Sequence, residues 1–259
     1  MANQTFRASN DPCKRMLAPS NHRFYSEWHQ DWMVANVLRE AGVMGDLSQK
    51  HLTYVDLAAN DAQRGSNSYY FDRCLKARGV CIEPNPHYHA GIMQKRSCAL
   101  EGVCVSDAEV VVDFVMRGPL GHIAPGRQLA KIKCVPLRTL LAGHALRHIN
   151  YLSLDIEGAE LGALRSIDWH TTTVDTITIE NSSPEISDFL AQHKLRPTLC
   201  SSLDTLYTRE GAVQLAAQRW YAQRAQYVLP NCITNQTELC TDKPNWSFIR
   251  CAKAEGRIH

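Results

Sequence analysis

Short apolar runs alternate with segments of helical pattern along most of this chain. The apolar runs at 51–59 and 79–84 are followed by helical patterns at 68–76 and 86–96. Strands of a parallel sheet give continuous apolar runs, because helices cover both of their faces. Strands that alternate with helices at this spacing predict a parallel, doubly wound sheet.

The alternation continues to about residue 210 and predicts the remaining elements. Strands are expected at 98–107, 109–116, 149–158 and 173–181, helices at 138–148, 161–167 and 184–193, and a closing hairpin at 195–200 and 204–210. We expect the strand at 109–116 to pair beside the one at 98–107. The segment 117–126 holds three glycines and two prolines. It is therefore expected to be an irregular loop that serves as a lid or a substrate loop.

The 259 residues divide into three expected parts. An N-terminal helical segment at 1–45 packs near the active site, the sheet and its helices fill 46–210, and an extension at 211–259 is helical and then cysteine-containing. The chain is 44% hydrophobic and 21% charged, which suits one sizeable α/β core.

Charge and hydropathy exclude two classes of partner. The formal net charge of +2 gives no basic surface of the kind that holds a phosphate backbone, so we expect no nucleic-acid partner. No apolar run reaches the length of about 18 residues that a membrane segment needs. We therefore expect a soluble protein and favour the cytoplasm. The sequence leaves the oligomeric state open.

The ten cysteines make the prediction of the cellular compartment less simple. None stands in a C-x-x-C pair, which argues against a zinc site. Cys81, Cys104 and Cys134 fall in apolar runs and are expected to be buried thiols, with disulfides expected in the tail. A secretory-pathway lumen stays as the alternative, because four N-x-S/T triplets begin at Asn3, Asn181, Asn235 and Asn245.

Carboxylates accumulate where the expected strands end. In parallel sheets such ends meet at one edge, where ligands bind. An acidic edge suits a cationic, hydroxyl-rich ligand, and Glu83 can accept hydrogen bonds from ribose hydroxyls. The glycine-rich turn that a diphosphate requires is absent after the first strand, so S-adenosylmethionine fits better than a nicotinamide cofactor. The acids are Asp56, Glu83, Asp107, Asp155 with Glu157, and Glu180.

The ordered segments YVDLAANDAQRGSN, GVCIEPNP, VCVSD, INYLSLDIEGAEL and DTITIEN resemble the FkbM-type methyltransferases. The resemblance covers roughly residues 24–209, and SEWHQDWMVANVL at 26–38 is similar to the N-terminal segment of that family. It implies a class I S-adenosylmethionine-dependent enzyme. It also implies a mostly parallel, seven-stranded, Rossmann-like sheet with helices on both faces.

The resemblance assigns cofactor-binding residues to the strand ends and to the loops that follow them. Ala58 and Ala62 stand where the family carries glycines. By similarity, Asp56, Ala58 and Asn60 line the methionine side, Asn67 and Ser68 hold the carboxylate, Glu83 with Pro84 and Asn85 lies at the ribose, Ser106 and Asp107 border the adenine, and Asp155 stands where the methyl group is delivered.

The resemblance also implies the chemistry, which is methyl transfer to a hydroxyl of a sugar, a glycan or another small hydroxylated acceptor. Glu157 is our first candidate for the general base, although it can instead cap the following helix. Asp155 and Glu180 are the next candidates, and His29 is an outside option. Asp155, Glu157 and Glu180 can also bridge a divalent metal ion, which we do not favour.

Two other functions remain as alternatives. A catalytically silent binding module is motivated by the two lost glycines. A nicotinamide-dependent oxidoreductase is motivated only by the strand-helix alternation.

Overall fold

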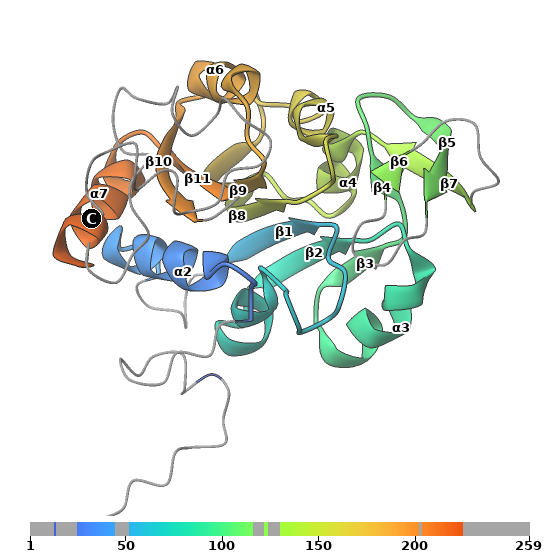
Figure 1. Ribbon diagram of the computed structural model, residues 1–259, viewed down its shortest axis with the longest axis horizontal. Helices are drawn as coiled ribbons and strands as arrows, with labels where there is room; N and C mark the ends of the chain where they lie inside the picture. Colours follow the sequence, from blue (N-terminus) through green and yellow to red (C-terminus); the bar gives the residue numbers. More distant parts are fainter. Residues whose placement is uncertain are drawn as a thin grey trace, which may run out of the picture.

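The computed structural model describes residues 13, 25–44, 52–115, 122–123, 130–201 and 204–224. Its main feature is a seven-stranded sheet in the order β10-β11-β9-β8-β1-β2-β3 (Figure 1). The strands are β1 Thr53–Leu57, β2 Arg78–Ile82, β3 Ala99–Glu101, β8 His148–Leu154, β9 Thr173–Glu180, β10 Leu195–Ser201 and β11 Asp204–Arg209.

The sheet is mostly parallel and confirms the predicted fold class. The pairs β1/β2, β1/β8, β2/β3 and β8/β9 are parallel. The predicted hairpin β10/β11 is antiparallel and adds to the edge of β9. Because the order reverses between β1 and β8, strand ends from both halves of the chain meet at the centre of the carboxyl edge.

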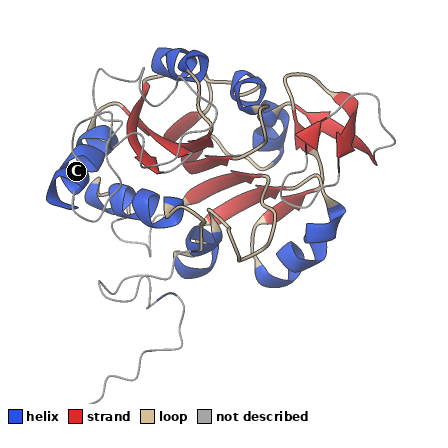
Figure 2. Cartoon of the chain, viewed as in Figure 1, coloured by secondary structure: helices blue, strands red, loops and turns tan. Residues whose placement is uncertain are grey.

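Helices cover both faces of this sheet (Figure 2). The first strand shows why, because successive side chains of a strand point to opposite faces. Tyr54 belongs to one buried cluster, which α2, α3, α7 and the helical turn η1 complete. Val55 and Leu57 belong to the other, with α4, α5 and α6. The elements are α2 Gln30–Glu40, η1 Tyr70–Cys74, α3 Pro86–Lys95, α4 Leu137–Gly143, α5 Glu160–Arg165, α6 Pro184–Gln192 and α7 Ala212–Arg224.

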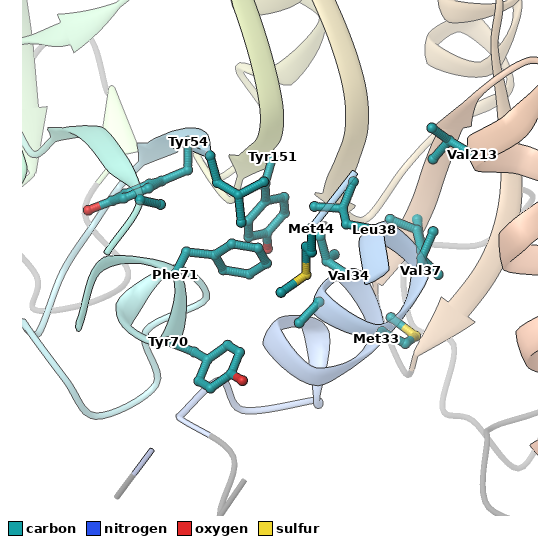
Figure 3. Packing of buried hydrophobic residues seen from close by; sticks show 14 of the residues in the cluster. Met33, Val34, Val37, Leu38, Met44, Tyr54, Tyr70, Phe71, Tyr151 and Val213 are labelled. Atoms are coloured by element: carbon teal, nitrogen blue, oxygen red, sulfur yellow. The ribbon is translucent and has the colours of Figure 1, made fainter. Parts of the chain in front are cut away.

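Aromatic side chains pack among aliphatic ones in the first cluster (Figure 3). Phe71 from η1 packs against Tyr151 from β8, with their ring centroids 4.9 Å apart. Val34 and Leu38 of α2 lie on the other side of these rings. The N-terminal helix is therefore part of the core beneath the sheet.

A second sheet corrects two predictions. The expected strand at 98–107 is split, because β3 stays in the large sheet whereas β4 Cys104–Val105 pairs with β7 Ala130–Val135. β5 Val110–Val115 pairs with β7 and with β6 His122–Ile123, not with β3. The sequence missed this because an apolar alternation indicates a strand without naming its partner. Apart from β6, most of the expected loop at 117–126 lies outside the described residues.

Two expected helices are shorter than their patterns indicated. The helix expected at 68–76 is a π-helical turn, η1. The helix expected at 138–148 ends at Gly143, and His148 already begins β8. No helix in the described part of the chain is long and apolar enough to cross a membrane.

The expectation of buried free thiols is wrong. Cys81 is bonded to Cys98 and Cys104 to Cys134, and a third disulfide joins Cys13 to Cys74. Buried strand positions gave no sign of these partners, because each pair meets only when neighbouring segments pack. The tail cysteines beyond residue 230, where disulfides were expected, lie outside the described residues.

Candidate functional site

Carboxylates from neighbouring strands meet at the carboxyl edge of the sheet. Asp56 lies near the end of β1, and Glu83 directly follows β2. Leu154 pairs with Ile179, so Asp155 and Glu180 lie side by side one residue further on. The β11 residue Asp204 pairs with Glu180 from the other side. The predicted gathering of acids is therefore correct for Asp155 and Glu180 but not for Asp107, and Asp204 is a member that the sequence analysis missed.

The loop after β1 is strained at its first residue. Ala58 has φ 60° and Asn60 has φ 47°, both in the left-handed region, whereas Ala62 has a negative φ and is buried. The Ala58 N–H donates to the carbonyl of Ile82 over 2.9 Å, which fixes the loop to β2. A non-glycine residue at such a φ costs about 1 kcal/mol. Ala58 therefore occupies a position where glycine would be unstrained, whereas Ala62 does not.

Glu83 connects two loops at the end of β2. Its side chain is buried, and its two oxygens accept the backbone N–H groups of Asn60 over 2.8 Å and Asn85 over 2.7 Å. Asn85 also caps α3 by accepting from the N–H of His87. Burial raises the pKa of Glu83, and these two N–H groups oppose the shift. Glu83 thus joins the loop after β1, through Asn60, to the loop after β2, through Asn85. Pro84, which lies between Glu83 and Asn85 in the sequence, is half-buried.

Asp56 is buried among hydroxyl and amide groups. It accepts a short hydrogen bond from the Ser68 hydroxyl. Asn67 donates from Nδ2 to Ser153 Oγ over 3.1 Å, which holds the same loop to β8. Burial raises the pKa of Asp56, opposed mainly by the charge of Arg96 and by hydrogen bonds from Ser68 and Ser153. The structure thus joins Ser68 to Asp56 and holds Asn67 to β8, and it adds Arg96, whereas the cofactor roles of these residues stay predictions.

The predicted adenine-side pair lies in a different setting. Asp107 was counted among the strand ends of the large sheet, but that strand ends at Glu101. Ser106 and Asp107 instead follow β4 of the second sheet, where Asp107 is exposed. Ser106 donates from its hydroxyl to the Ala108 carbonyl and from its N–H to the Val135 carbonyl.

The acids after β8 and β9 form the most strongly perturbed group of the edge. Oxygen atoms of Asp155, Glu157 and Glu180 lie within 4.8 Å of one another. Burial and a hydrogen bond with Glu180 raise the pKa of Asp155 to about 8, and burial raises that of Glu180. Glu157 is exposed, with φ 57°. Carboxylate oxygens at this spacing are also ligands that Mg²⁺ takes, so these three residues are the candidate metal set.

The N-terminal segment reaches this group through Gln30. Gln30 donates from Nε2 to Asp204 Oδ2 over 2.8 Å, and burial raises the pKa of Asp204 to about 7. His29, the outside candidate for a base, precedes α2 with an exposed side chain and φ 69°. Glu157, named as a possible helix cap, makes no such contact, because α5 has no side-chain cap and Glu160 accepts the N–H groups of Ile156 and Gly158.

Comparison with known proteins places this architecture in a family. No curated protein sequence matches the chain. A scan against protein-family models matches residues 56–203, more than half of the chain, to the methyltransferase FkbM domain. The match begins at Asp56 of β1 and runs through Glu83, Asp155 and Glu180. The chain therefore belongs to the FkbM methyltransferase family.

Proposed function

We propose that this protein is an S-adenosylmethionine-dependent O-methyltransferase that acts on a hydroxyl of a sugar, a glycan or another small hydroxylated molecule. Family membership supplies methyl transfer as the class of reaction. The cofactor and the acceptor class are inferred from the side chains at the carboxyl edge of the sheet.

Glu83 is the observation that supports the cofactor. Each of its oxygens accepts one backbone N–H and keeps a lone pair for a further donor. Adjacent ribose hydroxyls are donors of this kind. The acidic surroundings disfavour a diphosphate, which argues against the nicotinamide alternative. The other residues proposed to hold the cofactor are Asp56, Ala58, Asn60, Asn67, Ser68, Pro84, Asn85, Ser106, Asp107 and Asp155.

When bound, this cofactor supplies a methyl group on a positively charged sulfur, which an oxygen nucleophile can accept. The residues of this chain align the acceptor and take its proton. Glu157 is exposed and lies beside Asp155 and Glu180, so an acceptor hydroxyl can approach its carboxylate. Asp155 lies half-buried against Glu180, and its pKa is raised to about 8, so one proton is expected on this pair at neutral pH. Glu157 is therefore the proposed general base.

The three disulfides among the described residues indicate the cellular compartment in which this protein folds. Disulfides persist in oxidising compartments and are rare in the cytosol. We therefore propose the secretory-pathway lumen, the alternative weighed from the sequence, as the place where this enzyme folds.

One observation favours a second function. Ala58 adopts a left-handed conformation that disfavours alanine, at the loop where the cofactor would lie. A binding module that kept the fold and lost turnover would tolerate this strain. Binding of the cofactor without transfer to any hydroxylated acceptor is the behaviour expected of it.

Calorimetric titration of the full chain with S-adenosylmethionine and with S-adenosylhomocysteine tests the proposal. We expect both to bind, and Glu83→Gln to weaken binding at least about tenfold, because charge-assisted hydrogen bonds are lost. Glu185→Gln is the matched control, since Glu185 forms an exposed ion pair with Arg165. Absence of binding at millimolar concentration would overturn the proposed cofactor.

A further inference from the structure

Arg96 is a buried cation behind the loop that follows β1. It ends α3, and its side chain is fully buried. Its Nε donates to Asp72 over 2.7 Å and its Nη1 to Ser66 over 3.0 Å. Its Nη2 donates to Tyr54 over 3.1 Å and to Ser68 over 2.6 Å. Every nitrogen of the guanidinium therefore has a defined acceptor.

Two of these acceptors, Ser66 and Ser68, belong to the segment that carries proposed cofactor contacts. Ser66 and Ser68 flank Asn67 in the loop before η1. The Ser68 hydroxyl, which accepts from Arg96, donates to Asp56. One hydroxyl thus connects the guanidinium to the β1 carboxylate. The fixed planar geometry of the guanidinium sets the position of all these partners at once, which a lysine ammonium cannot do.

Neighbouring contacts fix both members of the Arg96–Asp72 ion pair. Asp72 also accepts from the Tyr54 hydroxyl over 2.9 Å and from the N–H of Ser97. Tyr54 has room for its ring only because Gly79 lies beside it, where a Cβ would come within 2.0 Å of the ring. Covalent bonds add to this, since Asp72 is two residues before the disulfide-bonded Cys74.

A disulfide also lies close to Arg96. Arg96 is two residues before Cys98, which is bonded to Cys81 on β2. The cation is thus anchored to the sheet and to α3, whereas the loop that it contacts starts from the strained Ala58. A rigid support beneath a strained loop restricts the conformations that the loop adopts before a ligand binds.

We propose that Arg96 is a positioning residue that presets the Ser66–Ser68 turn and Asp56 for the cofactor, acting through Ser68 rather than by touching the cofactor. This inference rests on the proposed function. The charge of Arg96 opposes the rise in the pKa of Asp56 that burial causes. The positioned carboxylate can then accept from the ammonium end of the ligand, and donors of the Ser66–Ser68 turn can donate to its carboxylate end, without rearrangement.

The test compares Arg96→Lys and Ser68→Ala with the control Arg165→Lys, which changes an exposed ion pair. Calorimetry with S-adenosylhomocysteine gives the dissociation constant for each variant. We expect Arg96→Lys and Ser68→Ala each to raise it about tenfold or more, because the loss of a charge-assisted hydrogen bond has this size. The control should bind as the unmodified chain does.

A double-mutant cycle separates positioning from general destabilisation. Because Arg96 acts through Ser68, the second substitution should add less than about threefold to the first. In turnover assays the KM for the cofactor should rise more than kcat falls. Guanidinium added to Arg96→Ala should restore part of the binding, which lost folding would not allow.

The outcomes distinguish two failures. Absence of binding by the unmodified chain would overturn the proposed function together with this inference. Binding by the unmodified chain, with unchanged dissociation constants in Ser68→Ala and in Arg96→Lys, would overturn the role of Arg96 alone. If Arg96→Lys fails to fold, Ser66→Ala decides, because it removes an acceptor of Arg96 that is not a proposed cofactor contact and leaves the ion pair with Asp72 in place. An unchanged dissociation constant in Ser66→Ala would then overturn the role of Arg96.

Discussion

Asp155 and Glu180 share a hydrogen bond at the ends of two adjacent parallel strands. Both are acids, so the contact is stable only while at least one of them carries a proton. Asp204 stands on the far side of Glu180 and adds a third acid with a raised pKa. The raised pKa values of these acids make the stability of the folded chain depend on pH, and the direction of the shift sets the sign of that dependence.

Stability should fall as the pH rises from about 4 to about 8. The pKa of Asp155 is about 8 in the folded chain and near 3.8 when unfolded, so the folded state binds more protons across this window. The free energy of unfolding then decreases with pH and levels off above the folded pKa. Asp155→Asn should flatten the curve, as measured by urea denaturation across this range.

The control for that experiment is Glu185→Gln, which changes only an exposed ion pair and should keep the slope of the unmodified chain. A variant Asp155→Asn with the same slope as the unmodified chain would contradict the shared proton.

Glu157→Gln should abolish most methyl transfer while cofactor binding stays intact. A general base contributes about 10²- to 10⁴-fold to a rate, and Glu157 is exposed beside the two coupled acids. Steady-state kinetics and calorimetry on the same variant measure the two quantities. Full activity in this variant would remove Glu157 from the base role.

Loss of activity of the unmodified enzyme in a chelator would favour the arrangement in which Asp155, Glu157 and Glu180 bind a divalent metal ion.

Ala58→Gly should stabilise the protein by about 1 kcal/mol, because glycine adopts φ 60° without a steric penalty. Denaturant midpoints measure the change. Ala62→Gly is the matched control, since Ala62 has a negative φ and is buried, and it should be neutral or destabilising. Equal effects of the two substitutions would show that the loop is not strained at Ala58.

Removing the Cys81–Cys98 disulfide with the double substitution Cys81→Ala and Cys98→Ala should lower the free energy of unfolding by about 3 kcal/mol. The bond spans 17 residues of sequence, and loop-closure entropy gives a value of this size. Denaturation under non-reducing conditions measures it. Peptide mass spectrometry of the oxidised chain should find Cys81 linked to Cys98, and free thiols there would refute the pairing.

The sequence indicated the sheet class because its signals are local. Buried parallel strands such as 149–158 and 173–181 are rich in β-branched and apolar residues, and turns and helix starts separate them. Asp56, Glu83, Asp155 and Glu180 were recognised as candidates because a carboxylate after such a run must lie at the strand end. That inference needs only the order of residues along the chain.

Features that depend on distant partners could not be found in this way. Cys81 and Cys98, Arg96 and Asp72, and Gln30 and Asp204 each meet only when separate segments pack. The same reason explains the second sheet, where β5 pairs with β7 rather than with β3.

The amino-acid sequence thus determined the alternation of strands and helices, the acidic strand ends and the family motifs. The tertiary structure alone decided the sign of φ at Ala58, the contact that raises the pKa of Asp155 beside Glu180, and the buried position of Arg96. The physical reason is that periodicity and residue type act within a few positions. Burial, hydrogen-bond partners and pKa shifts arise only where segments far apart in the sequence exclude water together.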